Sequence, residues 1–241
     1  MKKISLFIYG PLVLIFLVIA AALFAKGPKS YLWYRSQIKK WSRHVLWALD
    51  ITLVISSESK DILGSSSNTV LVANHRSHLD SVILWAICPE DKHLVFAAKK
   101  ELFRIPFLGA GLRLAKAISV DRSRGKVALR TLIDETRKLS SNEALVIYPE
   151  GTRGVGRLLD FKRGAFTIAL ESHRNILPVC IKGTDIIFPK GKQVPLSGEV
   201  FVRVCDVIPY EHIEGTNDIE LAKTVRELMH TTSFFEEELA K

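Results

Sequence analysis

Residues 68–87, NTVLVANHRSHLDSVILWAI, contain a complete strand–turn–helix unit. Residues 68–73 are rich in valine and leucine and lead into a polar turn, which predicts a buried strand. The apolar run 79–87 begins two residues after Ser77, and serine commonly precedes a helix. A strand that leads directly into a helix is the repeating unit of sheets with parallel strands.

The same alternation continues toward the C-terminus. Further strands are predicted at 94–98, 117–120, 144–148, 176–181 and 200–207, and further helices at 106–116, 126–139, 164–173 and 218–239. Because helices separate most of the strands, the connections must cross over the sheet. The sequence therefore predicts an α/β domain over residues 61–241, with a mostly parallel central sheet flanked by helices.

The N-terminal part has a different pattern. Residues 4–25 contain no charged side chain, and as a helix they would reach roughly 33 Å, close to the hydrocarbon core of about 30 Å. Residues 30–50 predict an amphipathic helix whose apolar positions are Tyr34, Ile38, Trp41, Val45 and Leu49. We interpret residues 1–60 as a membrane-binding segment of two helices, which either spans the bilayer or inserts into one leaflet. The alternative is that the second helix packs its apolar stripe on the catalytic domain.

Charge supports a membrane partner. The chain has a net charge of +9, and residues 1–50 carry eight basic residues against one acidic residue, a net +7. A nucleic-acid-binding domain would carry its basic surface on the folded body, so we expect anionic lipid headgroups as partners and no nucleic acid. Six basic residues follow the apolar segment by position 43 and two precede it. The positive-inside rule then predicts a cell-membrane protein with its folded domain on the cytoplasmic face.

The first candidate site is the pair His75 and Asp80. On a continuous helix, five residues turn about 140° beyond one full turn, so the two side chains would point apart. They can meet only if His75 lies in the turn before the helix and Asp80 lies in its first turn, with Ser77 as the N-cap. Asp80 would then orient His75 as a general base that acts on a substrate hydroxyl.

Two other interpretations of this stretch remain open. Ser77 and Asp80 match the capping-box pattern at the start of a helix, which is a purely structural role. A metal site built from His75, His78 and Asp80 is the second alternative. No further histidine or cysteine cluster supplies a convincing additional ligand, so we expect no metal.

The second candidate site is residues 148–157, YPEGTRGVGR, which follow a predicted buried strand. Glycines after a strand let backbone amides approach a phosphate group. Arg153 offers a planar fork that suits phosphate oxygens. The stretch has neither the spacing of a Walker loop nor that of G-x-G-x-x-G. A surface turn is the alternative to this phosphate-binding interpretation.

Together these two clusters resemble the glycerolipid acyltransferase family, and specifically its lysophosphatidic acid acyltransferases. The family's first block is a histidine, four residues and an aspartate, usually after an asparagine, and residues 74–80 fit it. Its third block is an aromatic residue followed by Pro-Glu-Gly-Thr-Arg, and residues 148–153 fit that, with tyrosine in the common phenylalanine place. Residues 118–122 and 176–180 are similar to the weaker second and fourth blocks, so the resemblance covers about residues 68–185.

The resemblance implies direct transfer of a fatty acyl group to the sn-2 hydroxyl of 1-acyl-glycerol 3-phosphate, which gives phosphatidic acid. It assigns the catalytic roles to His75 and Asp80. Substrate binding is assigned to Lys100, Arg122, Glu150, Gly151, Thr152 and Arg153. Glu150 either binds a glycerol hydroxyl or organises the glycines and Arg153. The donor is acyl-CoA or acyl carrier protein, and no cofactor is implied.

Three alternatives to this activity are kept. A related acyltransferase would act on glycerol 3-phosphate or another lysolipid. A non-catalytic lipid-binding protein with the same fold is disfavoured by the intact His75 and Asp80. A metal-dependent phosphoesterase would be inhibited by chelators.

Overall fold

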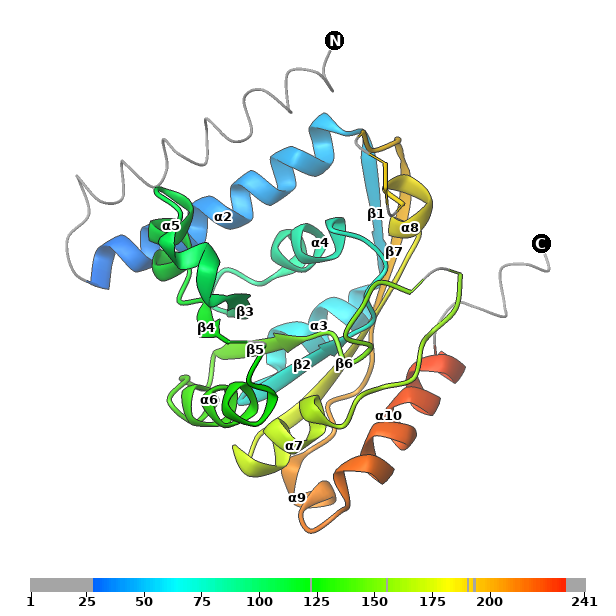
Figure 1. Cartoon of the computed structure of the whole chain (residues 1–241). Coiled ribbons are helices and arrows are strands. Elements are labelled where there is room, and N and C mark those ends of the chain that lie inside the picture. The colour runs from blue at the N-terminus through cyan, green and yellow to red at the C-terminus, as the bar shows by residue number, and fades with distance from the viewer. Residues whose placement is uncertain (1–27, 122, 155, 190, 193, 233–241) are drawn as a thin grey trace.

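The structure, a computed structural model, describes residues 28–232 except 122, 155, 190 and 193 (Figure 1). In chain order its elements are α2 (Pro28–Ala48), β1 (Ile51–Ile55), α3 (Ser57–Ser65), β2 (Thr69–Ala73), α4 (Leu79–Ile87), β3 (His93–Lys99), the 3-10 helix η1 (Lys100–Arg104), α5 (Leu108–Leu114), β4 (Ile118–Val120), α6 (Gly125–Arg137), β5 (Glu143–Ile147), α7 (Gly164–Glu171), β6 (Asn175–Lys182), α8 (Thr184–Ile187), β7 (Gly198–Val204), α9 (Tyr210–Ile213) and α10 (Asp218–Thr232).

The centre of the molecule is a seven-stranded sheet in the order β1-β7-β6-β2-β5-β3-β4. All neighbouring strands are parallel except β6 and β7. The predicted mostly parallel α/β sheet is confirmed. The strand of the opening motif, β2, lies in the middle of the sheet, between β5 and β6. Because β2 and β5 are parallel neighbours, the loops that follow them leave the same edge of the sheet side by side.

Helices cover both faces of the sheet, and β2 shows why. Alternate side chains of a strand point to opposite faces. Leu71 and Ala73 belong to the core that includes residues of α2, α3 and α4. Val70 and Val72 belong to the core on the other face, which includes residues of α6, α7 and α10. A strand that is apolar at nearly every position is therefore buried on both sides, as parallel strands in α/β folds usually are.

The amphipathic helix predicted at 30–50 forms as α2, but several side chains of its polar side contact the protein itself. Its apolar stripe packs into the core, which is the alternative that the sequence left open. Three of its basic side chains, assigned above to lipid headgroups, instead donate to carbonyls at and just after the end of α4. Arg35 and Lys39 donate to the Lys92 carbonyl at 2.6 and 2.8 Å, and Arg43 donates to the Ala86 carbonyl at 3.0 Å. Arg43 thus compensates a free carbonyl in the last turn of α4, and Arg35 and Lys39 fix the connection that follows it.

The predicted boundary near residue 60 falls inside α3. The strand before it, β1, pairs with β7 as an edge of the central sheet, so residues 28–60 are joined to the body by packing and by hydrogen bonds. Neither β1 nor α3 was predicted from the sequence pattern. The predicted apolar helix at 4–25 lies outside the described residues. Among the residues that the structure describes, no helix is both long and apolar enough to cross a membrane.

Candidate active site

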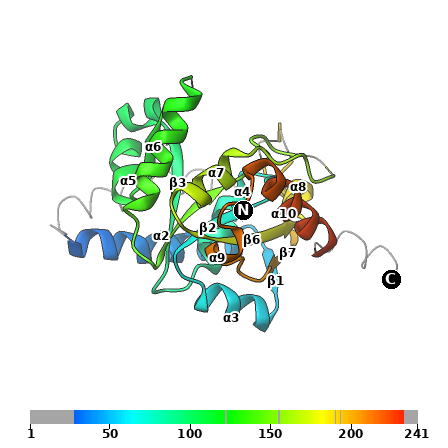
Figure 2. The same cartoon turned by 90° about the horizontal axis from the view of Figure 1, so that it is seen from below.

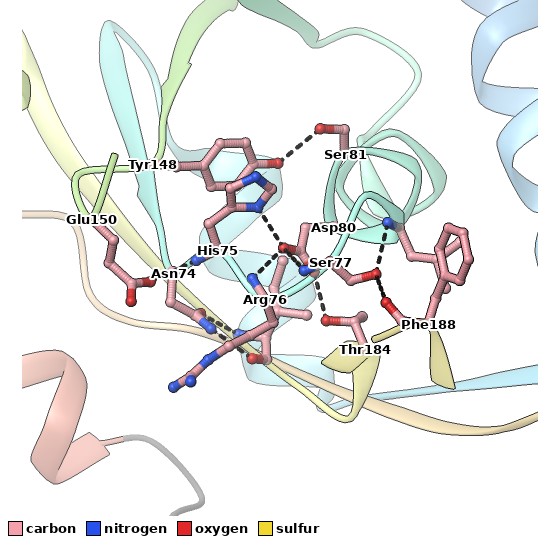
Figure 3. A network of polar contacts seen from close by, with 12 residues as sticks. Asn74, His75, Arg76, Ser77, Asp80, Ser81, Tyr148, Glu150, Thr184 and Phe188 are labelled. Atoms are coloured by element: carbon pink, nitrogen blue, oxygen red, sulfur yellow. Dashed lines mark hydrogen bonds and ion pairs between the residues drawn. The ribbon is translucent and has the colours of Figure 1, made fainter. Parts of the chain in front are cut away.

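The strand–turn–helix junction brings His75 and Asp80 together (Figure 3). β2 ends at Ala73, His75 lies in the following turn, and Asp80 lies in the first turn of α4. The distance between His75 Nδ1 and Asp80 Oδ2 is 2.8 Å. This is the geometry that the spacing argument required, so the predicted pairing is confirmed. The hydrogen bond at Nδ1 leaves Nε2 to act as the acid–base nitrogen.

Asp80 has no exposed surface, and both of its oxygens accept hydrogen bonds. Oδ2 accepts from the backbone N–H groups of Arg76 and Ser77 at 2.7 and 2.9 Å, and Oδ1 accepts from the hydroxyl of Thr184 at 2.6 Å. The first two contacts resemble the reciprocal half of a capping box, although the residue at the N-cap position is His78 and not the predicted Ser77. Asp80 therefore caps the turn and holds His75 at the same time.

Tyr148 supports the imidazole from one side. The two rings stack with centroids 4.2 Å apart and an angle of 17° between their planes. The Tyr148 hydroxyl lies 3.0 Å from Ser81 Oγ, on the residue after Asp80 (Figure 3). The tyrosine, which stands where phenylalanine is common in the family's third block, therefore connects the loop after β5 to α4. The stack and the Asp80 hydrogen bond together restrict the orientation of His75.

Glu150 is 2% exposed and does not line the cleft described below. Its carboxylate accepts from the backbone N–H of His75 at 2.7 Å and from the backbone N–H of Leu159 at 2.9 Å. In return, the backbone N–H of Gly154 donates to the His75 carbonyl at 2.8 Å. Burial raises the pKa of Glu150, although these donors oppose the shift. Of the two roles considered for Glu150, these contacts favour organising the loop over binding the substrate.

An open cleft of about 910 Å³ lies beside the pair. One part of its lining is polar and comprises His75, His78, Ser81, Lys99, Gly151, Thr152 and Arg153. The rest is almost entirely apolar and includes Trp85, Phe96, Leu102, Leu112, Val120, Leu132 and Val146. Burial lowers the pKa of His78, and the positive charge of Arg153 lowers it further. The site thus combines a base, a cationic pocket and an apolar wall.

Only some of the predicted substrate-binding residues line the cleft. Gly151, Thr152 and Arg153 line the cleft, as the phosphate-binding interpretation requires. Lys100 does not, because its ammonium group pairs with Asp121. Its neighbour Lys99, which was not among the predicted site residues, lines the cleft instead. Arg122 lies outside the described residues.

The metal alternative receives no support from the arrangement of side chains. Within the described part of the chain, no group of three or more histidine, cysteine, aspartate or glutamate side chains is placed to hold a metal ion. Both oxygens of Asp80 already accept hydrogen bonds from protein donors. The residues at the site can hold a proton and an anion.

The known proteins to which this chain is similar include several named as acyltransferases. A family model described as Acyltransferase matches residues 54–182. The 1-acyl-sn-glycerol-3-phosphate acyltransferase of Limnanthes alba is 34% identical over 149 residues, which cover 61% of this chain and 51% of that protein. The human 1-acyl-sn-glycerol-3-phosphate acyltransferase beta is 33% identical over 165 residues, which cover 68% of this chain and 59% of that protein. The chain therefore spans only about half to three fifths of the length of these relatives.

A solved structure extends the likeness to the whole fold. The crystal structure of the 1-acyl-sn-glycerophosphate (LPA) acyltransferase, PlsC, from Thermotoga maritima matches with a TM-score of 0.79. The match covers 100% of this chain and 95% of that chain at 24% sequence identity, so the two share a fold. The family model covers the strand–turn–helix junction, the cleft-lining loop after β5 and more than half of the 241 residues, and the chain belongs to the acyltransferase family.

Proposed function

We propose that this acyltransferase moves a fatty acyl group from a thioester to the sn-2 hydroxyl of 1-acyl-glycerol 3-phosphate, producing phosphatidic acid in phospholipid biosynthesis. The observation that carries the proposal is the position of His75, hydrogen-bonded to Asp80, on a cleft with Arg153 at its polar part and apolar side chains along the rest. A lysophosphatidate has the matching chemistry, because it combines a phosphate, a free hydroxyl and an acyl chain. The plant and human relatives bear the name of this activity.

The reaction is a direct transfer. His75 Nε2 removes the proton from the acceptor hydroxyl as its oxygen attacks the carbonyl carbon of the thioester. The resulting tetrahedral intermediate collapses with cleavage of the carbon–sulfur bond. The thiolate leaves and takes the proton from the imidazolium, so the base returns to its starting state. Asp80 orients the imidazole through Nδ1 and stabilises its charged form.

The polar part of the cleft is suited to the acceptor phosphate. Arg153 supplies a guanidinium group that can pair with two phosphate oxygens, and Lys99 adds a second positive charge. Gly151 and Thr152 contribute backbone and hydroxyl groups to the same lining. The donor would be acyl-CoA or acyl carrier protein, and no cofactor takes part in this scheme.

The place of action is part of the proposal. We infer that residues 4–25 anchor the protein in the cell membrane and that the catalytic domain lies on the cytoplasmic face. The uncharged N-terminal stretch and the excess of basic residues after it support this orientation. A membrane anchor would bring the cleft to a lipid acceptor.

The direct test is product analysis with an acceptor panel. Purified full-length protein and an acyl thioester would be incubated separately with lysophosphatidate, lysophosphatidylcholine and glycerol 3-phosphate, each with and without a chelator, and the products identified by mass spectrometry. We expect phosphatidate from lysophosphatidate as the main product. A preferred product from another acceptor would favour the related activity, and loss of turnover with chelator would favour the phosphoesterase alternative.

Replacing Arg153 by alanine should raise the KM for lysophosphatidate by about tenfold to a hundredfold, since a charge-assisted pair contributes roughly 1.5–3 kcal/mol. The KM for the thioester should change much less. The matched control is Arg163→Ala, which removes an exposed arginine that does not line the cleft. Steady-state kinetics with each substrate varied would check this, and an effect confined to the donor would refute the phosphate role.

Replacing Gly151 by alanine tests the loop that presents Arg153. Gly151 has φ +69°, and a Cβ there would lie 2.7 Å from Lys162 Nζ. The left-handed conformation costs about 1–2 kcal/mol for an L-residue, so Tm should fall by roughly 2–8 °C and the KM for the acceptor should rise. Gly156→Ala is a matched control, because Gly156 has the same φ but a Cβ there would meet no atom within 4 Å. Equal acceptor KM values for both variants would contradict a specific role for Gly151.

A further inference from the structure

Three of the basic side chains of α2 bond within the protein and are not free for lipid headgroups. Arg35, Lys39 and Arg43 are used to cap the carbonyls at and after the end of α4. A second region has an equal charge: residues 99–138 contain eleven basic and four acidic residues, a net +7 in a chain whose total is +9. This region covers η1, α5, β4 and α6, and in Figure 2 α5 and α6 lie on the side of the molecule away from α10.

Several cations of this region are available for an external partner. Arg104, Arg124 and Lys126 are exposed and lie outside the cleft lining, and within the described residues none of them makes an ion pair or a side-chain hydrogen bond. By contrast, Lys100 pairs with Asp121. Unpaired surface cations attract anions over roughly a Debye length of about 8 Å at physiological salt.

An exposed apolar tip directly follows Arg104. Ile105 and Phe107, on the connection between η1 and α5, are 46% and 49% exposed. Phe107 has φ 62° and ψ −51°, and the Leu108 N–H donates to the Pro106 carbonyl at 2.7 Å. These values describe a γ-turn of the strained, uncommon kind. Strained backbone persists where the surrounding structure enforces it, and such positions concentrate at functional sites.

The surrounding structure does enforce this turn. Gly109 packs so closely on η1 that a Cβ at this position would lie 2.2 Å from the Phe103 carbonyl oxygen. Arg113 Nη1 donates to the same oxygen at 3.1 Å, which ties α5 to η1. The turn is therefore held firmly in place, and it leaves about half of the surface of each of its two apolar side chains exposed to water.

The tip belongs to the same structural unit as the cleft. Leu102 of η1 and Leu112 of α5 line the apolar part of the cleft. α5 also packs against the start of α2, through Tyr34, and lies beside α2 in Figure 1. The neighbouring α2 residues Leu32 and Trp33 are themselves exposed. A surface that contacted the tip would therefore lie close to the cleft wall and to the beginning of α2.

We propose that Ile105 and Phe107, with the neighbouring Arg104 and the net positive charge of residues 99–138, form a membrane-contact element that binds an anionic lipid bilayer. Apolar and aromatic side chains flanked by lysine and arginine are typical of interfacial membrane binding. A bilayer fits better than an acidic protein, because a protruding tip inserts readily into lipid but offers little area for a specific protein interface. This element adds to the N-terminal anchor and holds the cleft at the membrane surface. This membrane-contact proposal rests on the proposed function in one respect, namely that the acceptor is a membrane lipid.

A fluorescence experiment tests the contact without catalysis. Full-length Phe107→Cys protein would be labelled with an environment-sensitive dye, and the native Cys88, Cys180 and Cys205 are buried, which favours selective labelling. We expect a blue shift when vesicles of equal parts phosphatidylglycerol and phosphatidylcholine are added, and a smaller shift with phosphatidylcholine alone. The control is dye at Ile186→Cys on α8, a position 72% exposed, which should shift much less.

The outcomes separate the possibilities. Sedimentation would first establish that the protein is bound to the vesicles. No shift at position 107 in vesicle-bound protein, or an equal shift at position 186, would overturn the proposal. A shift produced by acidic carrier protein and not by vesicles would overturn it in favour of a protein partner.

A kinetic experiment separates this proposal from the proposed function. The double variant Ile105→Ser, Phe107→Gly removes both apolar groups, and glycine accepts the positive φ at position 107 without strain. We expect turnover of vesicle-embedded acceptor to fall by about tenfold or more, while turnover of a short-chain, monomeric acceptor stays within about twofold. Equal losses on both acceptors would overturn the membrane role.

No turnover by the unmodified protein on either acceptor would instead refute the proposed function. The fluorescence result would still decide whether the tip contacts the bilayer.

Discussion

Replacing His75 by alanine should lower kcat by about a hundredfold to ten-thousandfold, the usual contribution of a positioned general base. Nδ1 of His75 is committed to Asp80, and its ring stacks on Tyr148, so no other described group is placed to repeat its role. The KM values should change little, because His75 acts on the proton of a hydroxyl that other groups position. Initial rates at saturating acceptor and donor would measure the effect.

The matched control for this variant is His78→Ala. His78 lines the same cleft three residues further along the chain, but within the described residues it has no hydrogen bond to a carboxylate. Its replacement should alter kcat by much less than the His75 replacement. Near wild-type turnover by the His75 variant would show that the base lies elsewhere. Equal losses from both variants would point to a general disturbance of the loop.

The pairing of His75 with Asp80 could be predicted because it is set by local geometry. Five residues separate the two, so only a turn followed by the first turn of a helix lets them meet. The run from Thr69 to Ile87 contains an apolar strand, a polar turn and an apolar helix, and each of these is recognisable by its own pattern. The parallel sheet followed from the same reasoning, applied to one strand–helix unit after another.

What the sequence did not reveal depends on contacts between distant residues. The sequence left two roles open for Glu150, binding a glycerol hydroxyl or organising the loop. The second is favoured by a contact that spans 75 residues of the chain, in which the Glu150 carboxylate accepts from the backbone N–H of His75. The basic face of α2 looked like a lipid-binding surface because nothing in its own sequence shows that α4 ends against it. Lys99 and Lys100 are adjacent, and only the packing of β3 and β4 decides which one reaches the cleft and which one pairs with Asp121.

The short strand β1 was missed for a related reason. Its five residues have burial that alternates between inside and outside, the pattern of an edge strand, and they follow a helix closely without a clear turn signal. Its partner β7 lies almost 150 residues later in the chain. Short edge strands carry little information of their own, because their stability comes from the neighbouring strand.

The second large effect is expected at Asp80, where two substitutions should separate chemistry from folding. In Asp80→Asn, the amide oxygen can take the place of Oδ2 and accept from His75 and from the N–H groups of Arg76 and Ser77. The amide nitrogen can then donate to the Thr184 hydroxyl, which is able to rotate and accept. The hydrogen bonds of the buried side chain are thus retained in number, so Tm should fall only modestly.

The negative charge, however, is lost in this variant. The imidazolium that forms when His75 takes the proton is no longer stabilised, so kcat should fall by about a hundredfold to ten-thousandfold. In Asp80→Ala, all of these donors are left without an acceptor in a site with no exposed surface, which should lower the free energy of unfolding by about 3–5 kcal/mol. Thermal unfolding and single-turnover rates would be compared for both variants. An asparagine variant that stays folded but loses turnover would show that the carboxylate charge serves the chemistry. An asparagine variant that is as unstable as the alanine variant, yet keeps its turnover while folded, would show that Asp80 is only a helix cap.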